Sequence, residues 1–264
     1  MSGNAQRVAR KVRGAARRFS DLAYIGQAGL TGFRLRDVHA VRSYDLLRDL
    51  EVRFHLQIRT VLYIGANKGQ DLPLLMEAYP WATVHCFEPQ ASCRDALRQV
   101  AAKYPGRVRI HQVALTDHEG SAVLRRPANH DQATSLFEPN TQMSQRFPHV
   151  TDWQQEEVAT STLDSWAARH ELVDDVLVKM DVQGSELLVL RGGRNTIKRV
   201  RLVVTELAVI PTYTDAPDMR LMFDELLQLG FGYAGETAQV RDTEAVVVEF
   251  DGAFARPRTP ALER

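Results

Sequence analysis

The segment Thr60-Val-Leu-Tyr-Ile-Gly-Ala-Asn-Lys-Gly-Gln70 carries the strongest indication of the fold. Its apolar run ends at Gly65, a second glycine follows at Gly69, and a segment with helical spacing comes next. A strand that ends in a glycine-containing turn and enters a helix brings backbone N–H groups close to a ligand at the helix N-terminus. The pattern therefore predicts an α/β sheet with a ligand site after this strand. The alternative is a tight strand-to-helix connection that binds nothing.

An acidic residue closes the next apolar run, Ala82-Thr-Val-His-Cys-Phe-Glu-Pro89. This acid, Glu88, lies 23 residues after Gly65, and one carboxylate at that distance can accept hydrogen bonds from both hydroxyls of a ribose. The glycine spacing is not the G-x-G-x-x-G of dinucleotide-binding folds, and no G-K-[ST] sequence follows it. The sequence therefore predicts a nucleoside cofactor without a pyrophosphate. S-adenosylmethionine (SAM) is the candidate, and a nicotinamide-dependent oxidoreductase is disfavoured.

Predicted strands and helices alternate along the rest of the chain. Strands are expected at 60–65, 82–87, 108–115, 121–125, 175–181, 201–206, 231–235 and 244–250, and helices at 70–79, 91–103, 163–170, 185–198 and 218–229. Thr162 or Ser161 is a suitable N-cap for the third helix, and residues 118–120 are expected to form a hairpin. This alternation predicts a mainly parallel, doubly wound sheet that ends in an antiparallel pair. The polar stretch 127–150 is expected to be a lid or a binding loop.

Composition limits the class of protein. The 33 basic and 33 acidic residues leave no net charge, so bulk electrostatics offers no attraction to nucleic acid. The two cysteines, Cys86 and Cys93, show neither metal-ligand spacing nor a disulfide framework. We find no apolar run long enough for a transmembrane segment and no signal-peptide pattern. The expected location is the cytoplasm.

The N-terminus departs from this charge balance. Its first twenty residues contain six basic side chains and no acid, namely Arg7, Arg10, Lys11, Arg13, Arg17 and Arg18. Apolar residues between them share one helical face. This segment is interpreted either as a peripheral contact with anionic lipid or a partner, or as a solvated tail.

The longest motif, Val178-Lys-Met-Asp-Val-Gln-Gly-Ser-Glu-Leu-Leu-Val-Leu-Arg-Gly192, resembles the signature of the FkbM family of SAM-dependent methyltransferases. The glycine turn and the Phe87-Glu-Pro segment belong to the same resemblance. Further matching motifs follow in order: Val113-Ala-Leu, Ser135-Leu, Thr162-Leu-Asp, Thr205-Glu-Leu and Phe250-Asp-Gly-Ala-Phe. The similarity covers about residues 58–256. It predicts a catalytic domain over 58–256, an N-terminal basic and helical extension over 1–57, and a C-terminal tail over 257–264.

The resemblance implies a class I methyltransferase fold, which is a seven-stranded, mainly parallel sheet with an antiparallel closing strand. It also implies methyl transfer from SAM to a hydroxyl of a sugar, in a glycan, an oligosaccharide or a glycosylated natural product. The alternatives are a non-sugar natural-product acceptor and a catalytically silent SAM-binding scaffold in a glycan-assembly complex. The sequence does not indicate an oligomeric state.

Two positions depart from the family pattern. Tyr63 stands where the family has an aspartate that helps to hold the methionine amino group, so another residue or the backbone must hold it. Gln183 stands where the signature has a frequent glutamate, and it keeps a hydrogen-bonding side chain without the charge.

The cofactor-binding candidates lie at or near the carboxyl ends of the predicted strands, where ligands of open α/β sheets bind. They are Gly65, Ala66, Asn67, Gly69, Gln70, Glu88, Pro89, Ala114, Asp117 and Asp181, with Thr116 as the alternative to Asp117 near the adenine.

Two acids that end apolar strands, Asp181 and Glu206, are the first candidates for catalysis. A buried carboxylate has a raised pKa and is a better base, so Asp181 is expected to accept the proton of the acceptor hydroxyl. The alternatives are a helix N-cap for Asp181 and a salt-bridged strand end for Glu206. Both could instead bind Mg²⁺, which prefers oxygen ligands. His130 is a second candidate base, and the acceptor contacts are predicted to be His130, Ser135, Gln183 and Tyr213.

Overall fold

The computed structural model describes residues 47–256 apart from 49, 53 and 243. Most of the predicted extension 1–57, with its six basic side chains, and the tail 257–264 lie outside these residues. Within the described part of the extension, residues 47–52 include helical turns, and Leu47 and Leu50 are buried in the core. No helix among the described residues combines the length and the apolar character needed to cross a bilayer.

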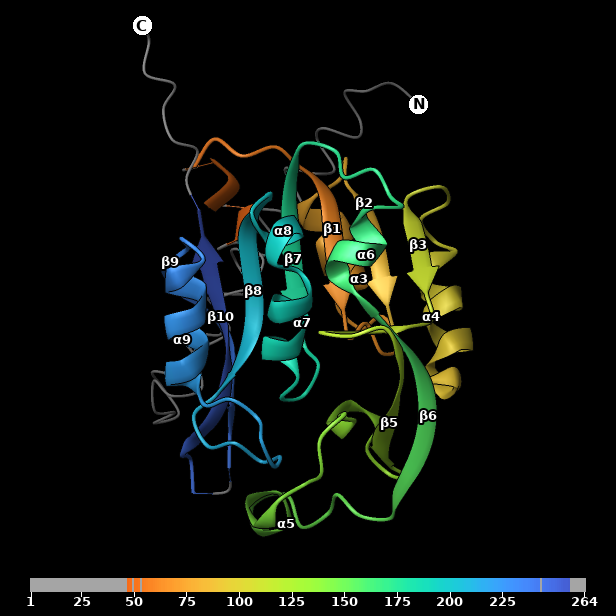
Figure 1. Cartoon of the computed structure of the whole chain (residues 1–264), viewed down its shortest axis with the longest axis vertical. Coiled ribbons are helices and arrows are strands. Elements are labelled where there is room, and N and C mark those ends of the chain that lie inside the picture. Colours follow the sequence, from red (N-terminus) through yellow and green to blue (C-terminus); the bar gives the residue numbers. More distant parts are fainter. Residues whose placement is uncertain (1–46, 49, 53, 243, 257–264) are drawn as a thin grey trace, which may run out of the picture. The chain divides into compact units, whose positions relative to one another are not determined.

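A seven-stranded sheet forms the centre of the molecule (Figure 1). Its strand order is β3-β2-β1-β7-β8-β10-β9. These strands are β3 (Val108–His111), β2 (Thr83–Phe87), β1 (Ile58–Ile64), β7 (Asp175–Met180), β8 (Val200–Ala208), β10 (Val247–Ala255) and β9 (Gly232–Arg241). The pairs from β3 to β8 are parallel, whereas β10 is antiparallel to both β8 and β9. This is the predicted class I methyltransferase arrangement, in which β1 and β7 lie at the point where the strand order reverses.

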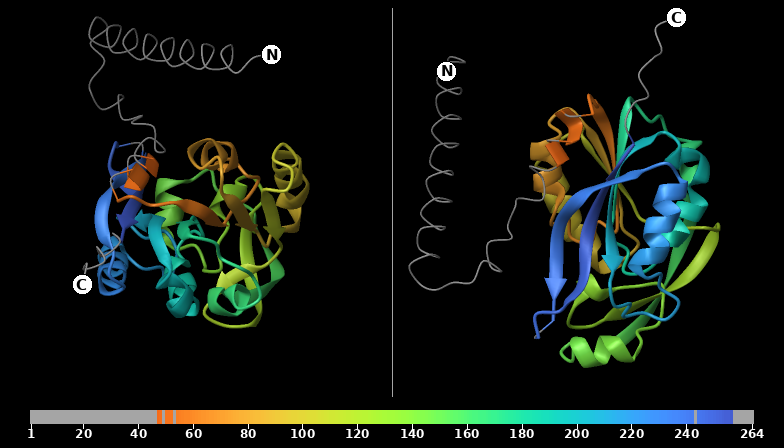
Figure 2. Two further views of the ribbon diagram at one scale, coloured as in Figure 1. Left: turned by 90° about the horizontal axis from the view of Figure 1, so that it is seen from above. Right: turned by 90° about the vertical axis from the view of Figure 1, so that its left-hand side faces the viewer.

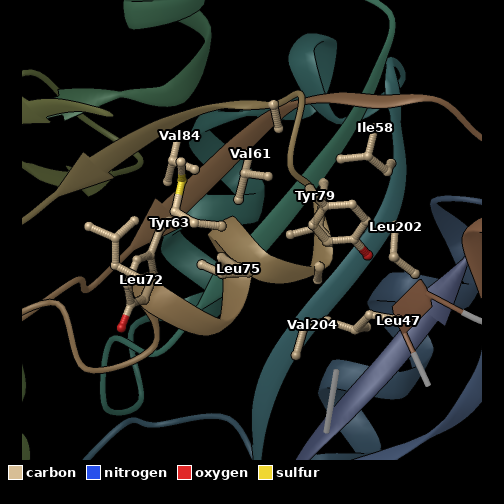
Figure 3. Close-up of a cluster of buried hydrophobic side chains, with 14 of the residues drawn as sticks. Leu47, Ile58, Val61, Tyr63, Leu72, Leu75, Tyr79, Val84, Leu202 and Val204 are labelled. Atoms are coloured by element: carbon tan, nitrogen blue, oxygen red, sulfur yellow. The ribbon is translucent and has the colours of Figure 1, made fainter. Parts of the chain in front are cut away.

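Helices cover both faces of this sheet, as the side view in Figure 2 shows. The helices are α3 (Leu72–Ala78), α4 (Arg94–Ala101), α6 (Leu163–Ala167), α7 (Glu186–Gly192), α8 (Arg194–Ile197) and α9 (Met219–Gln228), with the short η2 (Ala91–Cys93) before α4. Because neighbouring strand residues point to opposite faces, β1 contributes to two cores. Val61 and Tyr63 pack with α3 on one face (Figure 3), and Leu62 and Ile64 pack on the other.

A smaller three-stranded sheet adjoins the large one and corrects two expectations. It has the order β4-β6-β5, formed by β4 (Ala114–Thr116), β6 (Trp153–Thr162) and β5 (Gly120–Pro127). The single strand predicted over 108–115 is therefore two strands in two sheets, β3 and β4. The hairpin predicted at 118–120 is wrong, because the long strand β6 lies between β4 and β5 and pairs with both.

The polar stretch 127–150 contains more regular structure than its composition indicated. It includes the short η3 (Asp131–Ala133) and α5 (Thr141–Arg146), and the side chain of Asn140 caps α5 by accepting from the backbone N–H of Gln142. Met143 and Val150 anchor the stretch in a small apolar cluster that also includes Tyr213. The N-cap type of Asn140 and the helical spacing of Met143 and Phe147 were the signals in the sequence.

Other predicted elements have the expected type with shifted ends. Thr162 is the N-cap of α6, since its side chain accepts from the N–H of Ser165. The single helix predicted over 185–198 is interrupted at Gly193, which separates α7 from α8.

Candidate functional site

The turn after β1 owes its shape to two glycines and one strained residue. Gly65 (φ +79°) approaches β7 so closely that a Cβ there would lie 1.8 Å from the carbonyl oxygen of Asp181. Gly69 (φ +82°) would meet Leu97 at 2.9 Å. Between them, Asn67 has a φ of +45°, a conformation that asparagine tolerates better than most residues. The turn thus brings the end of β1 against the end of β7.

Glu88, at the end of β2, faces this turn. Its Oε2 accepts from the backbone N–H of Asn67 and its Oε1 from that of Gln90, both at 2.7 Å. The side chain is buried, and burial raises its pKa to about 7 although both donors lower it. A carboxylate offers about four lone-pair positions, so two remain for further donors. These two acceptor positions fit a ligand that donates from two adjacent hydroxyls, as the ribose of SAM can.

A cavity of about 260 Å³, here called the first cavity, lies over the turn and the ends of β1, β2 and β7. Polar groups at one side include Asn67, Gln70 and Glu88, and apolar walls are formed by Phe87, Ala114, Leu115 and Leu124. Pro89, Ser135, Asp181 and Gln183 also line it. Such a mixture of a few convergent polar groups and apolar walls is typical of a small-molecule site.

The far end of the first cavity contains an ion cluster that the sequence did not reveal. Lys179 is buried on β7, and its Nζ lies 3.0 Å from Oδ2 of Asp71, which precedes α3. Tyr63 donates to the same Asp71 oxygen at 3.4 Å, and Lys179 lies 5.5 Å from the centroid of the Tyr63 ring. Burial lowers the pKa of Lys179, but Asp251, Asp71 and Asp181 outweigh this and raise it well above the usual value. Asp71 thus places an acid beside Tyr63, the position where the family has its own aspartate.

A second cavity of about 280 Å³ adjoins the first. Four residues line both cavities: Gln132, Asp181, Gln183 and Asp251. The second cavity has an acidic side, formed by Asp181, Glu206, Glu249 and Asp251, and an apolar side, formed by Met143, Phe147, Val150, Val240 and Phe250. His130 also lines it. Two bound molecules, one in each cavity, would therefore meet at Asp181.

The acidic side of the second cavity disfavours the ionised forms of its carboxyl groups. Burial, followed by repulsion from Glu249 and Asp181, raises the pKa of Glu206 well above its usual value. Burial, followed by repulsion from Asp181, Asp251 and Glu186, raises the pKa of Glu249 to about 7. For Asp251 burial raises the pKa to about 6, although Lys179 opposes the shift.

The amide of Gln183 lies between two of these acids. Its Nε2 donates to Oδ1 of Asp181 at 3.0 Å and to Oε2 of Glu206 at 2.7 Å. The N-cap of the helix after Asp181 is Ser185, so Asp181 does not have the capping role that was its alternative. No group of three or more His, Cys, Asp or Glu side chains in the described part of the chain has the arrangement of a metal site. The predicted Mg²⁺ site at Asp181 and Glu206 therefore finds no support.

Two predicted acceptor contacts, Ser135 and Tyr213, have hydrogen-bond partners within the protein. Ser135 lines the first cavity and donates to the carbonyl oxygen of Gln183 at 2.6 Å. The hydroxyl of the buried Tyr213 lies 2.9 Å from the carbonyl oxygen of Ala133 and 3.3 Å from Oε1 of Gln183, and can donate to either. Tyr213 lines neither the first nor the second cavity, so the structure does not bring it to the proposed acceptor site.

Three predicted cofactor residues do not line the first cavity. Ala66 and Gly69 belong to the turn itself, where the N–H of Ala66 donates to the carbonyl of Phe87 and the N–H of Gly69 to that of Ala66. Asp117 follows β4, and its carboxylate lies 2.9 Å from Nδ1 of His118. The structure does not bring Asp117 to this cavity: Ala114 and Leu115 of β4 line it, whereas Asp117 lies beyond the end of that strand.

The model of the methyltransferase FkbM domain matches residues 64–233 of this chain. The chain belongs to the FkbM methyltransferase family. It is therefore a SAM-dependent methyltransferase. The match begins at the end of β1 and ends in β9. It includes most of the lining of the first cavity, whereas the part of the second cavity that is formed by residues 238–240 and 249–251 lies beyond it.

The individual proteins that this chain resembles have low sequence identity to it. The chain is 29% identical over 176 residues to the 2-O-methyltransferase NoeI of Sinorhizobium fredii, a match that covers 63% of this chain and 70% of NoeI. Among solved structures, precorrin-6y C5,15-methyltransferase from Geobacter metallireducens superposes with a TM-score of 0.44 at 11% identity, covering 83% of this chain and 88% of that one. The SAM-dependent methyltransferase SibL superposes with a TM-score of 0.41 at 15% identity, covering 82% of this chain and 55% of SibL.

Proposed function

We propose that this enzyme transfers the methyl group of SAM to a hydroxyl of a sugar, within residues 58–256 as the catalytic domain. The observation that carries the proposal is the meeting of two cavities at Asp181. One cavity has the glycine turn and Glu88, and the other has a carboxylate side facing an apolar side. Similarity to NoeI, whose name describes a 2-O-methyltransferase, supports oxygen as the methylated atom.

The first cavity is the SAM site in this proposal. SAM supplies a methyl group on a positively charged sulfur. Glu88 binds the ribose hydroxyls with its two remaining lone pairs, and Phe87 and Leu115 contact the adenine. Lys179 and Asp71, which form an ion pair at the far end, bind the carboxylate and the amino group of the methionine part. Asp71 thereby supplies the acidic group that the family has at the position of Tyr63.

The second cavity binds the acceptor. Sugars combine hydroxyls with an apolar ring face, which suits a cavity with polar groups opposite Phe147 and Phe250. Asp181 would accept the proton of the reacting hydroxyl, and SAM would supply the methyl group from its sulfur and leave as S-adenosylhomocysteine. His130 lies at the same cavity and contacts the acceptor. A positioned base contributes typically about 10²–10⁴-fold to a rate, and the alignment of the two reactants contributes several kcal/mol more.

An acceptor screen with radiolabelled SAM tests the proposal. Purified enzyme is incubated with mono- and oligosaccharides and with hydroxylated natural products, in parallel with Mg²⁺ and with a chelator. We expect methylated sugar in both conditions, because the amide of Gln183 already lies between the two acids of the expected metal site. Turnover of non-sugar acceptors alone would contradict the sugar assignment. Loss of turnover with the chelator would restore Mg²⁺ to the mechanism.

A further inference from the structure

We propose that Gln183 is a positioning residue, whose amide holds the carboxylates of Asp181 and Glu206 as one bridged pair and keeps Asp181 ready to accept a proton. The proposal rests on the proposed function, in which Asp181 is the base. It assigns Gln183 a role different from the acceptor contact that its place in the signature predicted.

The bridge uses both N–H groups of one nitrogen. A primary amide has two N–H donors, and the partners of Nε2 are one oxygen of Asp181 and one oxygen of Glu206. The other oxygen of Asp181 is left for the acceptor, and Asp181 lines both cavities. The amide oxygen lies on the opposite side, 3.3 Å from the hydroxyl of Tyr213. These partners determine which end of the amide faces the acids, because only the nitrogen can donate to them.

The backbone of Gln183 is held in an unfavourable conformation that aims the side chain. Its φ of +51° lies in the left-handed region, which is unfavourable for a residue other than glycine. The Oγ of Ser135 binds its carbonyl at 2.6 Å, and the next residue, Gly184, would clash with Ala216 at 2.8 Å if it had a Cβ. Strain of this kind persists where the surroundings enforce it. Ser135 therefore acts through Gln183.

The bridge matters because the pair lies among further charges. The groups that face it are Glu186 on α7, Glu249 and Asp251 on β10, Lys179 on β7, Glu88 on β2, Tyr213, and His130 across the second cavity. Most are acids, so a second negative charge in the pair is costly. Hydrogen bonds donated to a carboxylate favour its ionised form. Without the amide, both carboxylates would lose the donor that favours their ionised form, and Asp181 would be less available as a base.

Two substitutions and one control test this role. Gln183→Met keeps the length of the side chain without donors, and Gln183→Glu replaces the donors with a third acid. Gln155→Glu is the control for an added acid, because residue 155 is exposed on β6 and lines neither cavity. For both Gln183 variants we expect kcat to fall at least about tenfold at neutral pH with SAM affinity within about threefold by calorimetry. In the pH profile of kcat/KM, the midpoint on the acid side should rise by about one pH unit in the Gln183 variants and stay at the wild-type value in Gln155→Glu.

A measurement without acceptor separates this proposal from the proposed function. Carboxyl ¹³C NMR of labelled protein follows the titration of the pair directly, and we expect its midpoints to rise by about one pH unit in Gln183→Met. Unchanged midpoints, or a loss confined to acceptor KM, would overturn the positioning role. Failure of the wild-type enzyme to methylate any sugar would overturn the proposed function and leave the NMR result standing as evidence for the bridge.

Discussion

Two buried groups of titratable side chains lie at different places in this fold and differ in what surrounds them. The histidine–tryptophan cluster consists of His85 on β2, His111 on β3, and Trp166 and His170 in and after α6. The carboxylate cluster consists of Asp181, Glu206, Glu249 and Asp251 at the ends of β7, β8 and β10. In both clusters, burial is the first cause of the pKa shifts, and it favours the neutral form.

The two clusters differ in what their polar atoms contact. His85 Nδ1 lies 3.1 Å from His111 Nε2, Trp166 donates to His111 Nδ1 at 3.4 Å, and the ring of His170 stacks on Trp166 at 4.3 Å. The polar atoms of this cluster thus have protein partners: both ring nitrogens of His111 contact His85 or Trp166, and Nδ1 of His170 lies 2.7 Å from the carbonyl oxygen of Trp166. The carboxylates, by contrast, line two cavities. A shifted pKa is therefore common to both clusters, and what distinguishes the carboxylates, which we propose to be functional, is their access to a cavity.

The largest expected effect is in the carboxylate cluster. Asp181→Asn removes the proposed base and keeps the size of the side chain, so kcat should fall by at least about tenfold and up to about 10³-fold. SAM affinity, measured by calorimetry, should change little. Asp95→Asn on the exposed face of α4 is the control and should retain full activity. Full activity of Asp181→Asn would remove this residue from the mechanism.

The second-largest expected effect is on the affinity for SAM. Glu88→Ala removes a carboxylate that accepts from two backbone N–H groups and, in the proposed function, from the ribose. SAM binding should weaken by about 1–3 kcal/mol, because charge-assisted hydrogen bonds are lost. Calorimetric titration with SAM and with S-adenosylhomocysteine measures this. Equal affinity in the variant would show that the ribose binds elsewhere.

Local sequence patterns predicted much of this site and missed its long-range parts. The apolar runs of β1 and β7 and the glycine turn are local features, and the structure brings Gly65 and Asp181 together as expected for neighbouring parallel strands. The contributions of Asp71, Lys179 and Asp251 depend on charges that meet only after β1, β7, β8 and β10 have assembled into one sheet. Asp71 resembles an ordinary helix start in the sequence, and Lys179 interrupts an apolar strand without showing its partner.

The same dependence on long-range contacts explains why the structure places Asp117 and Tyr213 away from their expected sites. Asp117 was expected near the adenine because it follows a predicted strand, yet that strand divides between two sheets, and the division depends on pairing with residues 160–162. Tyr213 was expected to contact the acceptor because of its type. Its hydroxyl instead bonds to Ala133, 80 residues earlier in the chain, and side-chain chemistry cannot reveal such a partner.

The two clusters should also have opposite effects on how the free energy of unfolding changes with pH. For His85 and His111 the folded pKa is about 4, below the ordinary 6.5, so the unfolded chain binds protons first. Their contribution is present above about pH 6.5 and is lost as the pH falls towards 4. For Glu88, Glu249 and Asp251 the folded pKa is raised. The folded state then binds protons first, and stability rises as the pH falls below about 7.

A double variant separates these opposing contributions. Replacing both His85 and His111 by Phe should remove the loss of stability that their protonation causes at acid pH. Between pH 7 and pH 4, the free energy of unfolding should therefore fall by about 1–3 kcal/mol less in the double variant than in the wild type. Urea unfolding at a series of pH values measures the slope. His118→Gln, which changes an exposed histidine, should keep the wild-type slope. An unchanged slope in the double variant would mean that these histidines titrate normally in the folded protein.

The smallest expected effect is on the choice of acceptor. Four acids and no Lys or Arg line the second cavity, so an acceptor with a phosphate or carboxylate next to the reacting hydroxyl meets like charge. We expect its kcat/KM to be about two- to tenfold lower than that of the neutral analogue, with the difference in KM. Glu249→Gln should narrow this difference, because it removes an acid whose pKa of about 7 leaves it partly charged at neutral pH. Competition assays between paired acceptors at low and high salt measure the ratio. A preference for the anionic acceptor that survives high salt would show that the acceptor's charge lies outside the carboxylate cluster.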